Sequence, residues 1–319
     1  MEIKNRKKVS WQIAKDVTGR RVLMVNYYFI GEPGEGNPWV LVDAGIPESG
    51  KKIINEAESL FGENNPPQAI VLTHGYFDHI GALPELISKW PDVKVYAHER
   101  EMPYITGKAV YPAPDYLASG GGMALLSWVH PVKPLDLGDR AEALPSDGSI
   151  PHLPDWEYIH TAGYSGGHVS LFRKKDKVLL SGDAFISTYQ NTFFSILTHK
   201  YRVYSPPAYY PVNYKLALES LKKLAALEPA VAGTGHGIPV YGKELKDGLQ
   251  NLINLLERKQ LKREGDKTPI SLTDGGNVKP LSSSETMASG ALKYISGFAG
   301  LVLLTTAGYF IYSKIRSKR

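Results

Sequence analysis

The run Thr73-His74-Gly75-Tyr76-Phe77-Asp78-His79 brings three good metal ligands, His74, Asp78 and His79, close together in the chain. It follows an apolar run over residues 69–72, which predicts a buried strand, and it precedes a helical pattern over residues 80–87. We therefore expect the three ligands in a turn at the carboxyl end of a strand. Open α/β sheets place their functional sites at that edge. The run predicts a metal site in a protein of mixed strands and helices.

Strands that alternate with helices recur along the chain and predict an α/β sandwich. The predicted strands cover residues 22–30, 39–42, 69–72, 93–96, 156–159, 169–172, 178–180 and 231–234. The predicted helices cover residues 51–61, 216–227 and 242–263. Residues 9–21 are mixed and polar, and residues 102–154 show no regular pattern. We expect the loop over residues 103–150 and the aromatic-rich residues 193–214 to form the rim of a pocket for an apolar or amphipathic small molecule.

Further pieces of sequence carry loop-forming or metal-ligating residues. An early strand leads into Asp43-Ala44-Gly45, and a later segment reads His160-Thr161-Ala162-Gly163-Tyr164-Ser165-Gly166-Gly167-His168. Ser181-Gly182-Asp183 and Gly235-His236-Gly237 follow. In this order, the pieces resemble the motifs of the metallo-β-lactamase-fold hydrolases over about residues 20–260. The resemblance implies a four-layer αββα sandwich.

The resemblance also implies two adjacent metal positions, which this chain matches unequally. The second position is complete, with these residues: Asp78, His79, His236 and a bridging Asp183. At the first position His74 remains, but Tyr76 and Tyr164 stand where the family has histidines.

Three interpretations of the two tyrosines are open. In the first, one metal ion occupies the second position and both phenols donate hydrogen bonds. In the second, Tyr76 and Tyr164 ionise and bind a ferric ion with His74 and Asp183, as in the ferric site of the transferrins. Phenol has a pKa of about 10, so this ionisation needs a strongly Lewis-acidic ion. In the third, the site is degenerate and binds nothing, although buried carboxylates without a cation would be unfavourable.

We expect the chain to bind one divalent transition metal ion. Zinc is the expected metal, and iron and manganese are the alternatives. Such an ion activates water for hydrolysis of an ester, lactone, thioester or amide. Asp78 and Asp183 are the candidates for orienting the attacking water, and Tyr164 for donating to the developing oxyanion. A non-catalytic metal-binding or ligand-sensing module on the same fold is the alternative function.

The other histidines and Asp43 are expected to support the site or to lie outside it. Asp43 is expected to brace the metal loop, and His160 and His168 to hold neighbouring residues in place. The remaining histidines have no motif around them and are expected in loops or on the surface: His98, His130, His152 and His199.

Composition restricts the possible chemistry and partners. The 319 residues are 43% hydrophobic, enough for a sizeable core. The chain has no cysteine, which excludes disulfides, thiolate zinc ligands and thiol nucleophiles. Its net charge of +5 is concentrated at the two ends, without the internal basic stripe of a nucleic-acid reader. We therefore expect no nucleic-acid partner, and the sequence assigns no oligomeric state.

The C-terminal region departs from the composition of the rest. After a metallo-β-lactamase-like domain over residues 1–263, residues 264–294 form a polar linker. Residues 295–312 are apolar and uncharged, which predicts a transmembrane helix, and residues 313–319 form a basic tail. The basic N-terminus is not followed by the apolar run of a signal peptide. We expect a single-pass protein of the cell membrane with its catalytic domain in the cytoplasm.

Overall fold

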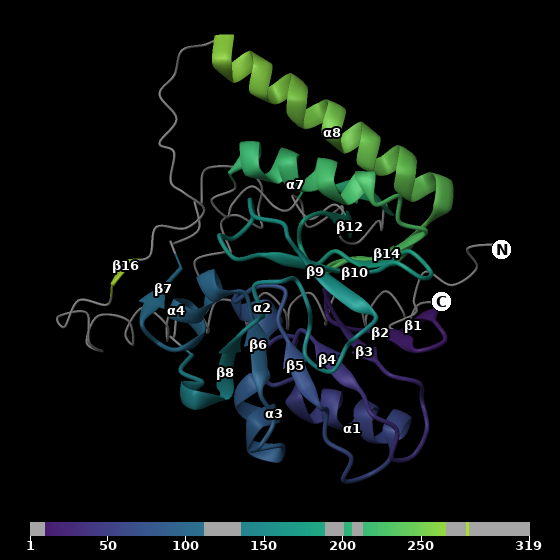
Figure 1. Ribbon diagram of the computed structural model, residues 1–319, viewed down its shortest axis with the longest axis vertical. Helices are drawn as coiled ribbons and strands as arrows, with labels where there is room; N and C mark the ends of the chain where they lie inside the picture. The colour runs from purple at the N-terminus through teal and green to yellow at the C-terminus, as the bar shows by residue number, and fades with distance from the viewer. Residues whose placement is uncertain (1–9, 112–134, 189–200, 206–212, 266–278, 281–319) are drawn as a thin grey trace, which may run out of the picture.

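The computed structural model describes residues 10–111, 135–188, 201–205, 213–265 and 279–280, and it contains two facing sheets (Figure 1). The seven-stranded sheet has the order β1-β2-β3-β4-β5-β6-β8, and the five-stranded sheet has the order β15-β14-β11-β10-β9. The first sheet contains β1 (Ser10–Ala14), β2 (Val17–Val22), β3 (Val25–Ile30), β4 (Val40–Val42), β5 (Ala69–Val71), β6 (Val95–Ala97) and β8 (Ala141–Ala143). The second contains β9 (Trp156–His160), β10 (Val169–Arg173), β11 (Val178–Leu180), β14 (Val231–Gly233) and β15 (Val240–Tyr241).

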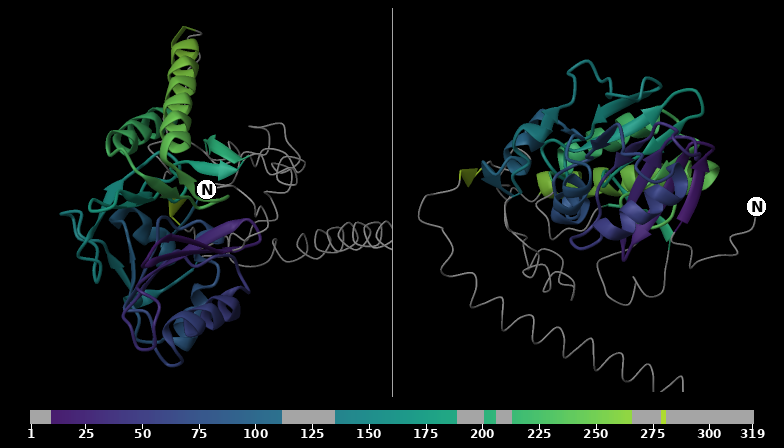
Figure 2. Two further views of the ribbon diagram at one scale, coloured as in Figure 1. Left: turned by 90° about the vertical axis from the view of Figure 1, so that its right-hand side faces the viewer. Right: turned by 90° about the horizontal axis from the view of Figure 1, so that it is seen from below.

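Helices cover the outer face of each sheet. The longer ones are α1 (Gly50–Phe61), α3 (Leu83–Lys89), α7 (Tyr214–Ala226) and α8 (Gly242–Gly265). Figure 1 and the left view of Figure 2 show α1 beside the first sheet and α7 and α8 beside the second, on opposite sides of the molecule. The short helices are α2 (Phe77–Ile80), α4 (Met102–Ile105) and the 3₁₀ helices Glu99–Glu101 and Gly138–Arg140. Two small two-stranded sheets complete the described structure. One pairs β12 (Ile186–Thr188) with β13 (Tyr201–Tyr204), and the other pairs β7 (Ala109–Val110) with β16 (Lys279–Pro280).

Alternate residues of the central strands belong to different hydrophobic cores. In β4, Val40 and Val42 pack between the two sheets, whereas Leu41 packs under α1 and α3. In β11, Val178 and Leu180 face the space between the sheets, and Leu179 faces α7 and α8. This alternation is the period of two that a pleated strand imposes. Three cores separate four layers, and the predicted αββα sandwich is confirmed.

The parallel strands direct their carboxyl ends to one edge of the sandwich. In the first sheet β4, β5, β6 and β8 are parallel neighbours, and in the second β11 is parallel to β14. The loops after β5, β11 and β14 carry His74, Asp183 and His236, respectively. The fold therefore collects residues from both sheets at one place.

Two details of the predicted elements are wrong. Residues 22–30 are not one strand, because β2 and β3 pair as a hairpin around Leu23 and Met24. An apolar turn hides this reversal, although Leu23 has a positive φ of 52° and is 79% exposed. Residues 10–14 and 141–143, for which the sequence predicted no strand, form β1 and β8 at the two edges of the first sheet. Their short, partly exposed strands lack a strong apolar signal.

No helix in the described ranges is both long enough and apolar enough to cross a bilayer. The predicted transmembrane segment, residues 295–312, lies outside the described residues, as do the basic tail, His130, His199 and most of the predicted linker.

Candidate metal centre

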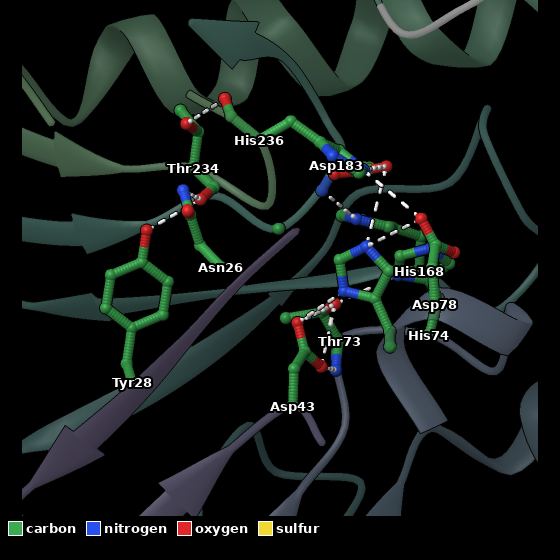
Figure 3. A network of polar contacts seen from close by, with 12 residues as sticks. Asn26, Tyr28, Asp43, Thr73, His74, Asp78, His168, Asp183, Thr234 and His236 are labelled. Carbon is green, nitrogen blue, oxygen red and sulfur yellow. Dashed lines mark hydrogen bonds and ion pairs between the residues drawn. The ribbon is translucent and has the colours of Figure 1, made fainter. Parts of the chain in front are cut away.

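Five predicted ligands come together at the edge of the sandwich to which the parallel strands point. Figure 3 labels His74, Asp78, Asp183 and His236 among them. The loop after β5 supplies His74, the short helix α2 supplies Asp78 and His79, and the loops after β11 and β14 supply Asp183 and His236. Their donor atoms form two overlapping groups, each with all members within 4.8 Å of one another: His74, His79 and Asp183, and Asp78, His79 and His236.

Most of these donor atoms are buried and have no hydrogen-bond partner. Within the described residues, five of the six such side-chain atoms belong to this cluster. They are Nε2 of His74, Oδ1 of Asp78, Nε2 of His79 and both carboxylate oxygens of Asp183. Buried polar atoms are normally paired, so a group of unpaired nitrogen and oxygen atoms directed at one another indicates a missing partner. Imidazole nitrogens and carboxylate oxygens are borderline-to-hard donors, and the cluster fits a transition metal ion.

The second ring nitrogen of each histidine is bound elsewhere. Nδ1 of His79 lies 2.8 Å from Oδ2 of Asp43, and Nδ1 of His236 lies 2.9 Å from the carbonyl oxygen of Met24. The Thr73 hydroxyl donates to Asp43 and accepts from Nδ1 of His74 at 2.9 Å. All three rings consequently direct Nε2 at the centre, as outer partners commonly do for metal-binding histidines. Asp43 braces the metal loop as expected, because it also accepts the Thr73 backbone N–H.

His168 is held in a fixed neutral form beside the cluster. The Ser170 hydroxyl donates to the carbonyl oxygen of Ser181 and so accepts from Thr161, which in turn accepts from Nδ1 of His168. Nε2 of His168 therefore carries a lone pair, and it accepts the Asp183 backbone N–H at 2.8 Å. Burial lowers the pKa of His168 to about 3, which agrees with this neutral state. His168 positions the Asp183 main chain.

The acids and bases of the cluster perturb one another. Burial disfavours the charged carboxylate of Asp183, but His236 and His79 outweigh it and hold its pKa well below the ordinary value. Burial also opposes charge on His79, yet Asp43, Asp78 and Asp183 raise its pKa to about 10. His236 lies 3.3 Å from Asp183, an ion pair without hydrogen-bond geometry, and its pKa is raised despite burial. Without a metal, protons on these histidines balance the carboxylates.

The two tyrosines flank His74. The ring of Tyr76 lies 5.1 Å and that of Tyr164 5.3 Å from the His74 ring, and the two phenol rings are 4.9 Å apart. The Tyr76 hydroxyl donates to the carbonyl oxygen of Tyr164 at 2.9 Å. Burial, followed by the charge of Glu101, raises the pKa of Tyr76 well above its ordinary value. Tyr76 is protonated in this arrangement, which favours the interpretation of the phenols as hydrogen-bond donors.

The loop that carries His236 is braced by residues that the sequence did not reveal. The Asn26 side chain donates to the carbonyl oxygens of Thr234 and Gly237, at 2.8 and 2.9 Å, and the Tyr28 hydroxyl donates to Thr234 at 2.6 Å. Gly235 must be a glycine, because a Cβ there would lie 2.1 Å from Oδ1 of Asp183. A buried asparagine inside the apolar run of β3 was the signal that could have identified this contact.

A second missed residue is Glu101, at the end of the 3₁₀ helix Glu99–Glu101. Its carboxylate is fully buried and accepts hydrogen bonds from both loops that carry the site tyrosines. Burial raises its pKa, although these hydrogen bonds oppose the rise.

The three other histidines of the described residues, His98, His152 and His160, are not part of the cluster. The His160 ring donates from Nε2 to the Gly166 carbonyl oxygen at 2.9 Å and stacks on His98 at 4.2 Å. His152 has a φ of 63° and lines a separate pocket with Trp156 and Arg173.

Known proteins resemble this chain in sequence and in structure. The family model of the metallo-beta-lactamase superfamily matches residues 20–236. The probable metallo-hydrolase YflN of Bacillus subtilis (strain 168) is 46% identical over 246 residues, which cover 77% of this chain and 93% of YflN. A hydroxyacylglutathione hydrolase of Erwinia tasmaniensis is 31% identical over 121 residues, 38% of this chain and 34% of that protein.

A solved structure shows the same fold at low sequence identity. MEM-A1, a subclass B3 metallo-beta-lactamase isolated from a soil metagenome library, superposes with a TM-score of 0.55 at 16% identity. The match covers 83% of this chain and 99% of MEM-A1. Together with the family match and the metal-ligand cluster, these similarities show that the chain belongs to the metallo-β-lactamase superfamily and is a metal-dependent hydrolase.

Proposed function

We propose that this protein is a membrane-anchored hydrolase that holds one divalent transition metal ion, zinc, and cleaves an ester, lactone, thioester or amide with water. The observation that carries the proposal is the group of buried donor atoms without hydrogen-bond partners, contributed by His74, Asp78, His79 and Asp183. Without a metal the cluster balances its carboxylates only by keeping protons on His79 and His236, and a bound cation would replace those protons.

The number of ions follows from the residues around His74. Asp78, His79 and His236 form one group of donor atoms, and Oδ2 of Asp183 lies 3.8 Å from Nε2 of His79 and 3.3 Å from Nε2 of His236, so these four residues are the proposed donors for one ion. His74 falls in the overlapping group with His79 and Asp183. On the other side of His74, the rings of Tyr76 and Tyr164 pack against each other and are almost fully buried. Phenols are poor ligands for zinc at neutral pH because their pKa is about 10. One ion is therefore the proposed stoichiometry.

The chain's own groups can bind and orient the reactants. The bound cation would lower the pKa of a water molecule and polarise the substrate carbonyl. Asp78 is the more accessible carboxylate, since its side chain is 14% exposed and that of Asp183 is fully buried. We assign to Asp78 the orientation of the attacking water and the acceptance of its proton. Asp183 holds the cation, and Tyr164 is the proposed donor to the oxyanion.

The names of the relatives support acyl chemistry. The relative from Erwinia tasmaniensis is named a hydroxyacylglutathione hydrolase, and YflN is named a probable metallo-hydrolase. The first name specifies hydrolysis of an acyl compound and the second only a metal-dependent hydrolase, and we propose acyl transfer to water as the reaction class of this chain.

Membrane anchoring is proposed from the sequence of residues 295–312. An uncharged apolar run of this length suffices for a spanning helix, and Lys314, Arg316, Lys318 and Arg319 follow it as a basic flank. We propose a cytoplasmic catalytic domain on this anchor.

The metal proposal is tested with the full-length protein. We expect about one transition metal ion per chain by elemental analysis, together with hydrolysis of a simple aryl ester. Asp183→Ala and His236→Ala should lose the ion and reduce hydrolysis by at least about 100-fold, because a ligand is removed. His152→Ala, in a separate pocket, should retain both. Metal retention without any ester, thioester, lactone or amide turnover would instead support the non-catalytic module.

Replacing the two tyrosines should change the metal stoichiometry. In a Tyr76→His, Tyr164→His double variant, imidazoles replace the phenols beside His74, and we expect elemental analysis to rise from about one ion to about two. The Tyr76→Phe, Tyr164→Phe variant removes the hydroxyls without adding ligands and should stay at one. A wild-type chain that already holds two ions would contradict the proposed stoichiometry.

Metal binding should release protons. His79 has a pKa of about 10 in the metal-free structure, so at pH 7.5 its proton must leave before the ring can bind a cation. The apparent affinity for zinc should therefore rise by about tenfold or more per pH unit between pH 6 and 8. Calorimetric titration in buffers of different ionisation enthalpy measures the release directly. Binding without proton release would show that His79 is not a ligand.

The anchor makes a separate prediction. The full-length chain should stay in the membrane fraction after alkaline carbonate extraction, whereas a chain that ends at Gly265 should be recovered in the supernatant. Extraction of the full-length chain under these conditions would contradict a spanning segment.

A further inference from the structure

Glu101 joins two loops of the metal centre through one carboxylate. Oε2 accepts the Gly75 backbone N–H at 3.0 Å and the Tyr111 hydroxyl. Oε1 accepts the Ser165 hydroxyl at 2.7 Å and the Gly167 backbone N–H at 2.8 Å. Four donors satisfy a charge that is fully buried. Charge-assisted hydrogen bonds of this kind are stronger than bonds between neutral groups.

The two backbone contacts lie one residue away from functional histidines. Gly75 follows His74, whose Nε2 is directed at the metal centre. Gly167 precedes His168, whose Nε2 accepts the Asp183 backbone N–H. One carboxylate thus links the main chain beside a ligand with the main chain beside the residue that holds Asp183.

The approach of Glu101 requires the absence of side chains on both loops. A Cβ on Gly167 would lie 2.7 Å from Cγ of Glu101, and a Cβ on Gly75 would lie 2.6 Å from the Tyr111 hydroxyl oxygen. The opposite side of the second loop is also held, because Nε2 of His160 donates to the Gly166 carbonyl oxygen. The turn over residues 165–167 therefore has contacts on two sides.

We propose that Glu101 is a positioning residue of the metal centre. Its single carboxylate accepts the backbone N–H groups of Gly75 and Gly167 and thereby sets the distance between His74 and Asp183. This inference rests on the proposed metal-dependent function. Its four hydrogen bonds come from the Tyr111 hydroxyl and from groups of the two loops, so Glu101 acts on the ligands through the main chain of those loops. Outer residues that orient metal ligands typically change metal affinity by about 10- to 100-fold.

The test is Glu101→Gln in the full-length protein. The amide has one acceptor, so its NH₂ group must face either the Gly75 N–H or the Gly167 N–H, and one loop loses its partner. We expect zinc to bind about 10- to 100-fold more weakly in competition with a chromophoric chelator. The visible absorption of the Co²⁺-loaded protein should also change, because that spectrum reports ligand geometry. Glu99→Gln, an exposed position on the same 3₁₀ helix, is the matched control and should leave both unchanged.

The outcomes separate this inference from the proposed function. A folded Glu101→Gln protein with wild-type zinc affinity and an unaltered Co²⁺ spectrum would overturn the positioning role, even if its melting temperature fell. A wild-type chain without zinc affinity would overturn the proposed function and this inference with it. If the Glu101→Gln protein does not fold, the zinc affinity of Ser165→Ala tests the positioning role instead, because this variant removes one of the four hydrogen-bond donors to Glu101. Its zinc affinity should fall by about two- to tenfold, and an unchanged affinity would overturn the inference.

Discussion

Both carboxylate oxygens of Asp183 lie in the protein interior without a hydrogen-bond donor, and the surrounding loops are arranged to supply positive charge to them. Nε2 of His79 and Nε2 of His236 lie 3.8 and 3.3 Å from Oδ2 of Asp183. An oxygen atom hydrogen-bonded to Nδ1 of each ring orients the ring so that Nε2 faces this carboxylate. His168 holds the Asp183 main chain, and Gly235 leaves space for the carboxylate. The folded chain thus tolerates a buried charge that only a cation or protonated histidines can balance.

The layered architecture makes such an arrangement possible. Apolar residues alternate along the central strands and fill three separate cores, which fixes the two sheets against each other. The loops at the carboxyl ends of β5, β11 and β14 do not have to fill these cores, so they can carry polar residues. The site remains rigid because its loops are tied by side-chain and backbone hydrogen bonds, including those of Asn26, Tyr28 and Glu101.

The sequence predicted the ligands better than it predicted their support. His74, Asp78 and His79 are close in the chain and follow an apolar strand, whereas Asp183 and His236 were inferred from the resemblance of their segments to the metallo-β-lactamase motifs. Glu101 and Asn26 act only through residues far away in sequence, and no local pattern reveals such a contact. The hairpin at Leu23 was missed for another reason, because its turn is apolar and lacks Gly, Asn or Pro. The alternation of strands and helices predicted an α/β sandwich and the resemblance implied its four layers, whereas the short edge strands β1 and β8 were not predicted.

The metal ligands come from both halves of the chain, from residue 74 to residue 236. In the unfolded chain the neighbouring donors His74, Asp78 and His79 are far from Asp183 and His236, so a complete binding site exists only after both sheets have formed and docked. A cation that binds this late state adds stability by mass action without lowering the barrier to folding. Its effect should fall mainly on the rate of unfolding, and the metal-loaded protein would persist longer without being formed faster. The metal centre would then slow the separation of the two sheets during unfolding, in addition to its role in hydrolysis.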